Sequence, residues 1–107
     1  MAEMEDMVNK LKEVFNPQKA AGINAVVQLK LKDQSENADW MLIIKDQQMH
    51  IEQGKNENAR LSIIANSQDL IDIFTGKMDG VSAYMMGKIW VTGDLDFGMR
   101  LASLFGR

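Results

Sequence analysis

The side chains that could carry out chemistry are few in this sequence. The chain has one histidine, His50, and no cysteine, so a metal site would have to take its other ligands from carboxylates. The nearby acidic residues, Asp46 and Glu52, have the spacing of solvent-facing turn and strand positions. We therefore expect His50 neither to bind a metal nor to act as a general base.

The other polar motifs are typical of structural roles. Asp94 and Asp96 precede an apolar stretch and suit the N-cap of a helix. Asp69 and Asp72 lie three residues apart on one predicted helix, as many exposed carboxylates do. Gly76-Lys77 lacks the preceding glycine and the following Ser or Thr of a phosphate-binding loop, and no serine lies in a nucleophile-elbow context. The sequence therefore predicts no catalytic site, no metal site and no cofactor.

Length and composition predict a single domain over residues 1–107, with 46% hydrophobic and 25% charged residues. A net charge of −3 and the lack of interleaved basic and aromatic residues argue against a nucleic-acid partner. No apolar run approaches the length of a membrane span, and the acidic, amphipathic N-terminus does not resemble a signal peptide. Together with the lack of cysteine, this leads us to expect a cytoplasmic protein.

Residue periodicity predicts the elements of the first two thirds of the chain. Apolar residues at helical spacing indicate an amphipathic helix over residues 3–15, which Asn16-Pro17 ends. Four segments then alternate between apolar and polar residues, as half-buried strands do. These strands are expected at residues 25–32, 40–45, 49–52 and 59–66.

Capping residues predict the elements of the last third. Ser67 is expected to cap a helix that ends at Gly76, and Gly87 is expected to close a short helix over residues 81–86. A strand over residues 89–92 follows, and then a final helix capped by Asp94 or Asp96. A succession of strands followed by helices is typical of an α+β fold with helices on one face of the sheet.

The last third also contains a specific sequence motif. Ala59 to Lys77 (ARLSIIANSQDLIDIFTGK) and Met78 to Gly93 (MDGVSAYMMGKIWVTG) resemble the sterol carrier protein type two domain, or non-specific lipid-transfer family. The family has two Gly-Lys pairs eleven residues apart, as Gly76-Lys77 and Gly87-Lys88 are here. The resemblance covers the whole chain, and this spacing is its most specific part.

The resemblance implies a five-stranded, mainly antiparallel sheet, with helices packed on one face and enclosing a hydrophobic tunnel. It implies a non-catalytic carrier of fatty acids, fatty acyl-CoA, phospholipids or sterols that makes transient contact with membranes. The candidate lining comprises positions that the residue periodicity also turns inward. These are Val27, Leu29, Trp40, Leu42, Ile44, Leu61, Ile63, Phe74, Tyr84, Met85, Ile89, Val91, Phe97, Leu101, Leu104 and Phe105.

The chain departs from the family pattern in two ways that bear on the ligand. Tyr84-Met85 is followed by Met86 where the family often has two aromatic residues, which predicts a more deformable wall. Asp94 and Asp96 lie where the family has a flexible, glycine-rich entrance. A negative mouth would disfavour a fatty acyl-CoA head group unless a cation faces it. The candidate cations are Lys77, Lys88 and Arg100.

The alternation of the strands leaves a second interpretation open. If the candidate lining residues face the helices, Met41, Ile43, Ile64 and Trp90 share the opposite face of the sheet, where polar residues are expected. These four residues either cover one another, or lie under the N-terminal helix, or form an exposed interaction patch. In the last case the protein is an interaction module without a physiological lipid, which forms a homodimer through this face or docks on a membrane or an enzyme.

Overall fold

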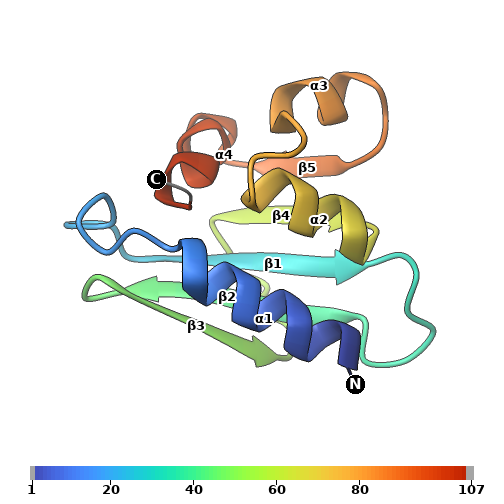
Figure 1. Cartoon of the computed structure of the whole chain (residues 1–107), viewed down its shortest axis with the longest axis horizontal. Helices are drawn as coiled ribbons and strands as arrows, with labels where there is room; N and C mark the ends of the chain where they lie inside the picture. The colour runs from blue at the N-terminus through green and yellow to red at the C-terminus, as the bar shows by residue number, and fades with distance from the viewer. Residues whose placement is uncertain (1, 106–107) are drawn as a thin grey trace.

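The computed structural model describes residues 2–105, and in it the chain adopts an α+β fold (Figure 1). The order of the elements is the predicted one: a helix, four strands, two helices, a strand and a helix. The elements are α1 (Ala2–Val14), β1 (Ala25–Leu31), β2 (Asp39–Lys45), β3 (Gln48–Gln53), β4 (Leu61–Ala65), α2 (Ser67–Phe74), α3 (Gly80–Met85), β5 (Trp90–Gly93), α4 (Leu95–Leu101) and the short 3-10 helix η1 (Ala102–Leu104).

The five strands form one mixed sheet in the order β3-β2-β1-β4-β5. Strands β1 and β4 are parallel and the other three pairs are antiparallel, which confirms the mainly antiparallel sheet. The parallel pair requires a crossover connection between β3 and β4. The Gln28 side chain forms hydrogen bonds with this connection. The Nε2 group of Gln28 donates to the Gly54 carbonyl at 2.9 Å, and the Asn56 N–H donates to Gln28 Oε1 at 2.7 Å.

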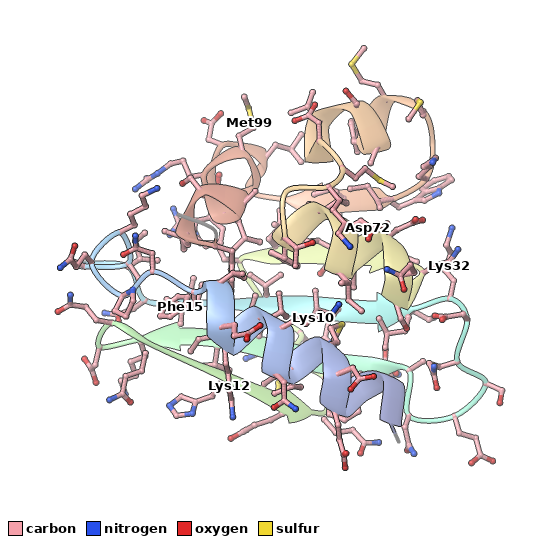
Figure 2. All side chains as sticks on the ribbon, in the orientation of Figure 1. Lys10, Lys12, Phe15, Lys32, Asp72 and Met99 are labelled. Atoms are coloured by element: carbon pink, nitrogen blue, oxygen red, sulfur yellow. The ribbon has the colours of Figure 1, made fainter. Side chains whose placement is uncertain are left out.

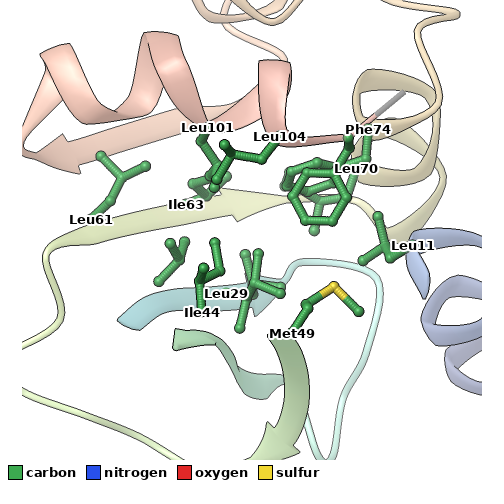
Figure 3. Packing of buried hydrophobic residues seen from close by; sticks show 14 of the residues in the cluster. Leu11, Leu29, Ile44, Met49, Leu61, Ile63, Leu70, Phe74, Leu101 and Leu104 are labelled. Carbon is green, nitrogen blue, oxygen red and sulfur yellow. The ribbon is translucent and has the colours of Figure 1, made fainter. Parts of the chain in front are cut away.

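The inner face of the sheet carries the hydrophobic core, because the buried residues of the strands alternate as predicted. Helices α1 and α2 lie over this face in Figure 1, and Met7 and Leu11 of α1 are fully buried against it. Figure 3 shows Leu11 and Leu70 pointing toward Leu29 from the helices. Within residues 2–105, no helix has the length and apolar character needed to cross a bilayer.

The four apolar residues expected on the outer face of the sheet lie there in two separate pairs. Met41 and Ile43 lie side by side on β2, and Ile64 and Trp90 are cross-strand partners on β4 and β5. Strand β1 runs between the pairs and presents Gln28 opposite Met41 and Lys30 opposite Ile64. Met41 and Ile43 are half-buried, whereas Trp90 is 65% exposed. The four residues therefore do not form one contiguous patch.

The two Gly-Lys pairs end α2 and α3 in the same way. Gly76 has a φ of +85° and Gly87 a φ of +75°, in the left-handed region that favours glycine. After Gly76, the Lys77 N–H donates to the Asp72 carbonyl at 2.8 Å, and after Gly87, the Lys88 N–H donates to the Ala83 carbonyl at 2.9 Å. Both are bonds of the Schellman motif, so each pair marks a helix end as predicted.

The predicted capping role of Ser67 is wrong. Asn66 occupies the N-cap position of α2 and makes no side-chain capping bond, while Ser67 is the first helical residue and is buried. Asp33, which follows β1, caps the helix instead: its Oδ1 accepts the Ser67 N–H at 3.1 Å and the Ser67 hydroxyl at 3.0 Å. The Asp33 carboxylate therefore accepts an N–H group at the start of α2 that has no partner within the helix, although Asp33 is distant from this helix in sequence.

Candidate functional site

A cavity of about 390 Å³ lies between the β4–β5 side of the sheet and helices α2, α3 and α4. Its wall consists almost entirely of apolar side chains and glycine, and all of it comes from the last third of the chain and β4. The lining residues are Leu61, Ile63, Leu70, Ile73, Phe74, Asp79, Gly80, Val81, Tyr84, Met85, Ile89, Val91, Leu95, Gly98, Met99, Leu101 and Ala102.

The floor of the cavity is set by the pairing of β4 with β5. Ile63 lies opposite Val91 in this register, so both side chains face the helices from adjacent strands. Helix α4 passes close above them because Gly98 has no side chain: a Cβ at this position would lie 3.4 Å from both methyl carbons of Leu61. Gly98 therefore keeps the helix near the sheet while leaving the space beside it open.

The cavity reaches the surface between α3 and α4. Five large apolar residues both line it and are exposed, which places them at its rim together with the exposed Asp79. Among them Met85 is 79% exposed and Met99 is 69% exposed, and Figure 2 shows Met99 on the outer side of α4. The other three apolar rim residues are Val81, Tyr84 and Leu95. Large apolar side chains at an opening to solvent are unusual unless they meet an apolar ligand or surface.

Eight of the sixteen residues that the sequence proposes as lining lie together in this wall. They come from β4, α2, α3, β5, α4 and the segment before β5. They are Leu61, Ile63, Phe74, Tyr84, Met85, Ile89, Val91 and Leu101. The structure places these eight side chains in one wall. Their contact with a ligand stays a prediction.

The other eight proposed residues lie outside the wall. Val27, Leu29, Leu42 and Ile44 belong to the solid core on the β1–β2 side, where α1 fills the space over the sheet. Trp40 is half-buried beside this core and donates its Nε1–H to the Asn37 carbonyl at 2.7 Å. Alternation along a strand predicts which residues face inward but does not predict whether a helix or a cavity covers them.

Phe97, Leu104 and Phe105 are buried but packed against protein. The Arg60 guanidinium lies 4.2 Å from the centre of the Phe97 ring. The Phe105 ring lies 4.7 Å from that of Phe74 and 5.5 Å from that of Phe15, measured between centroids. The Leu104 carbonyl accepts the Asn16 N–H at 2.7 Å, so the segment that follows α1 lies against the C-terminal end of η1.

Nine lining residues are not among the sixteen that the sequence proposes as the lining. Leu70 and Ile73 share the apolar side of α2 with Phe74, so their helical spacing was a usable signal. Gly80 and Gly98 line the wall by lacking a side chain, which periodicity does not reveal. The remaining five are Asp79, Val81, Leu95, Met99 and Ala102.

Two aspartates cap the helices on either side of the opening. Asp79 Oδ2 accepts the Ser82 N–H at 3.0 Å and the Ser82 hydroxyl at 2.9 Å, and these bonds hold the pKa of Asp79 below its ordinary value. Asp94 accepts the Phe97 N–H at 3.0 Å and pairs with Arg60, and both contacts lower the pKa of Asp94. Both carboxylates are therefore charged at neutral pH.

The wall of the cavity contains few polar side chains. Among the lining residues, Asp79 and Tyr84 are those with polar side chains. In the part of the chain that the structure describes, no three His, Cys, Asp or Glu side chains gather as metal ligands. His50 lies exposed on β3, where its cross-strand partner is Ile43. The feature that this geometry provides is apolar volume open to the surface.

Comparison with known proteins agrees with this geometry. The sequence profile of the SCP-2 sterol transfer family matches residues 8–106. Sterol carrier protein 2 of Oryctolagus cuniculus is 29% identical over 84 residues, which is 77% of this chain and 15% of the relative. The chain thus spans about a seventh of that relative's length, and what the whole relative does is a property of that larger protein.

Two solved structures show the same fold. The inverting sec-alkylsulfatase Pisa1 from Pseudomonas sp. superposes with a TM-score of 0.80 at 19% identity, over 91% of this chain and 15% of the enzyme. The solution structure of palmitated SCP2L2 from Aedes aegypti superposes with a TM-score of 0.62 at 20% identity, over 94% of this chain and 91% of that chain. The second match shows that the fold also exists as a protein of nearly this size.

Proposed function

The chain belongs to the SCP-2 sterol transfer family, and from this premise we propose that it is a non-catalytic carrier that holds a lipid in the cavity between α3 and α4. The observation that supports this proposal most directly is the apolar wall of a cavity of about 390 Å³ that opens at a rim of exposed apolar side chains. Such a rim gives a hydrocarbon chain a mainly apolar route into the cavity.

The energetics favour an occupied cavity. Burying a hydrocarbon chain contributes about 0.8 kcal/mol per CH₂ group, or roughly 10 kcal/mol for twelve carbons before association costs are subtracted. An empty apolar cavity forgoes the same contacts along its whole wall. The mosquito protein of the same fold is described as palmitated, which supports a lipid with an elongated hydrocarbon chain as the ligand class.

The test uses a bulky side chain to fill the cavity. Ala102 lines the wall and Ser103 beside it is exposed, so Ala102→Phe occupies the cavity while Ser103→Phe adds the same ring outside it. We expect wild type and Ser103→Phe to bind a pyrene-labelled dodecanol in a fluorescence titration, and Ala102→Phe to bind it at least tenfold more weakly.

Native mass spectrometry of the purified protein gives a second, independent measurement. We expect lipid from the expression host to accompany wild type and Ser103→Phe and to be depleted in Ala102→Phe. Bare wild-type protein together with no rise in Tm on adding any lipid would reject the carrier function. Equal binding by both Phe variants would place the lipid elsewhere on the molecule.

A further inference from the structure

The charges around the cavity are unevenly distributed. Among the seventeen residues that line it, Asp79 is the one with an ionisable group that is charged at neutral pH, and no lysine, arginine or histidine belongs to the described wall. The sequence led us to expect the acidic mouth at Asp94 and Asp96. Neither lines the cavity, and Asp94 is engaged by Arg60 at 3.0 Å. The negative charge at the wall therefore comes from a different residue, at the start of α3.

The Asp79 carboxylate is held in place at the wall. Both of its bonds, to the N–H and the hydroxyl of Ser82, end on Oδ2. Among the contacts of the described residues, Oδ1 receives no donor, so this oxygen can accept one from a ligand. These bonds also lower the pKa of Asp79, which keeps the group charged near neutral pH.

The cations near the cavity in sequence do not neutralise Asp79. Lys77, Lys88 and Arg100 each lie next to wall segments in the chain, but none of them lines the wall. Arg60 does not line the wall either, and its side chain is paired with Asp94. A ligand head group at the wall therefore meets a carboxylate without a matching cation.

We propose that Asp79 makes the cavity select lipids with an uncharged, hydroxyl-bearing head group over lipids with a carboxylate or phosphate head group. This inference rests on the proposed lipid-carrier function and adds the head-group class to it. A lipid hydroxyl can donate to Oδ1 of Asp79, which lines the wall. A lipid carboxylate or phosphate instead meets a like charge. Fatty alcohols and sterols share the favoured chemistry.

The test compares two ligands that differ only in the head group. Lauryl alcohol and laurate compete with pyrene-labelled dodecanol for wild type, Asp79→Asn and Glu52→Gln. Asparagine keeps an acceptor for the Ser82 N–H, so the cap of α3 is preserved while the charge is removed. Glu52 is exposed on β3, opposite Met41 on the outer face, so Glu52→Gln changes the net charge equally without altering the wall. Cholesterol as a third competitor distinguishes a sterol from a fatty alcohol.

We expect Asp79→Asn to raise the affinity for laurate about fivefold, the effect of one unit charge a few ångströms away in a water-like environment. The affinity for lauryl alcohol stays the same or falls. The affinity for laurate relative to that for lauryl alcohol therefore rises. Glu52→Gln leaves the ratio unchanged. Salt at about 1 M shrinks the difference between wild type and Asp79→Asn, because it screens exposed charges.

The outcomes separate this inference from the function on which it rests. If both competitors bind and their affinity ratio is the same in wild type and Asp79→Asn, Asp79 does not select the head group and the carrier function stands. If neither competitor nor the pyrene probe binds wild type, the carrier function itself fails. An equal shift in Glu52→Gln would show a general effect of net charge and overturn the role of Asp79.

Discussion

Arg60 and Asp94 are joined twice, once through the backbone and once through their side chains. The Asp94 N–H donates to the Arg60 carbonyl at 3.0 Å, and Arg60 Nε donates to Asp94 Oδ2 at 3.0 Å. Asp94 Oδ1 in turn accepts the Phe97 N–H. The pair therefore ties the start of β4 to the start of α4, on which Leu95 and Met99 form part of the cavity rim.

Asp94→Ala is expected to lower Tm by roughly 4–8 °C, because it removes the cap of α4 together with the partner of Arg60. Asp94→Asn retains an acceptor for the Phe97 N–H and is expected to lower Tm less. Asp96→Ala is the control, since Asp96 is exposed in the first turn and makes no capping bond. Differential scanning fluorimetry measures all three, and an equal loss in Asp96→Ala would reject the special role of Asp94.

Stability is expected to fall in acid through Asp79 and Asp94. Hydrogen bonds lower the folded pKa of each below the ordinary value of 3.8, so protons bind more readily to the unfolded chain. Both groups therefore stabilise the fold above pH 3.8, and this contribution is lost as the pH falls through their lowered pKa. Urea unfolding at neutral pH and near pH 3 measures the loss. The Asp79→Asn, Asp94→Asn double variant should lose less than wild type, and an equal loss would contradict this assignment.

Gly93→Ala is expected to destabilise the fold by about 1–3 kcal/mol. Gly93 has a φ of +107°, and a Cβ there would lie 2.6 Å from the Arg60 carbonyl oxygen, which is a backbone atom. Gly98→Ala is a useful comparison, because its new Cβ meets only side chains at 3.4 Å and alanine favours a helix. Chemical denaturation should show a large loss for Gly93→Ala and a small change for Gly98→Ala.

Oxidation of the rim methionines is expected to weaken lipid binding without unfolding the protein. Met85 and Met99 are exposed and line the cavity, whereas Met7 is fully buried. A sulfoxide makes the rim polar, so mild peroxide should lower the affinity for pyrene-labelled dodecanol severalfold at unchanged Tm. The Met85→Leu, Met99→Leu variant still contains the exposed Met86 and should keep its affinity after peroxide. A similar loss in that variant would assign the effect to another residue.

The outer sheet face is expected not to drive self-association. Gln28 and Lys30 separate the Met41–Ile43 pair from the Ile64–Trp90 pair, so the exposed apolar area is divided. Wild type and Trp90→Lys should both sediment as monomers at micromolar concentration. A wild-type dimer that Trp90→Lys dissociates would restore this face as an interface.

The order of the elements could be predicted because local patterns decide it. The alternation along β1 and β4, and the Gly-Lys pairs at 76–77 and 87–88, are set by neighbouring residues. The cap of α2 could not be predicted, because Asp33 reaches Ser67 across 34 positions of sequence. Local pattern thus predicts where a helix ends more reliably than which distant side chain satisfies its start.

The candidate site was predictable on one side of the sheet only. Ile63 and Val91 line the cavity, whereas Leu29 and Leu42 have the same inward pattern and lie under α1. Whether an inward-facing residue belongs to the cavity wall or to the solid core depends on which helix covers its strand. Periodicity contains no information about this covering. Phe105 illustrates the same limit, since its position depends on contact with Phe15 from the opposite end of the chain.

Every described residue that lines the cavity lies between Leu61 and Ala102, while α1 and strands β1 to β3 contribute only to the solid core. Mutations therefore act on different properties according to where in the chain they fall. If the cavity holds a lipid, changes at the exposed rim, such as Val81, Met85 or Met99, are expected to alter ligand preference with little effect on the core beneath α1. Under the proposed function, ligand preference and the stability of the fold therefore depend on different parts of the chain.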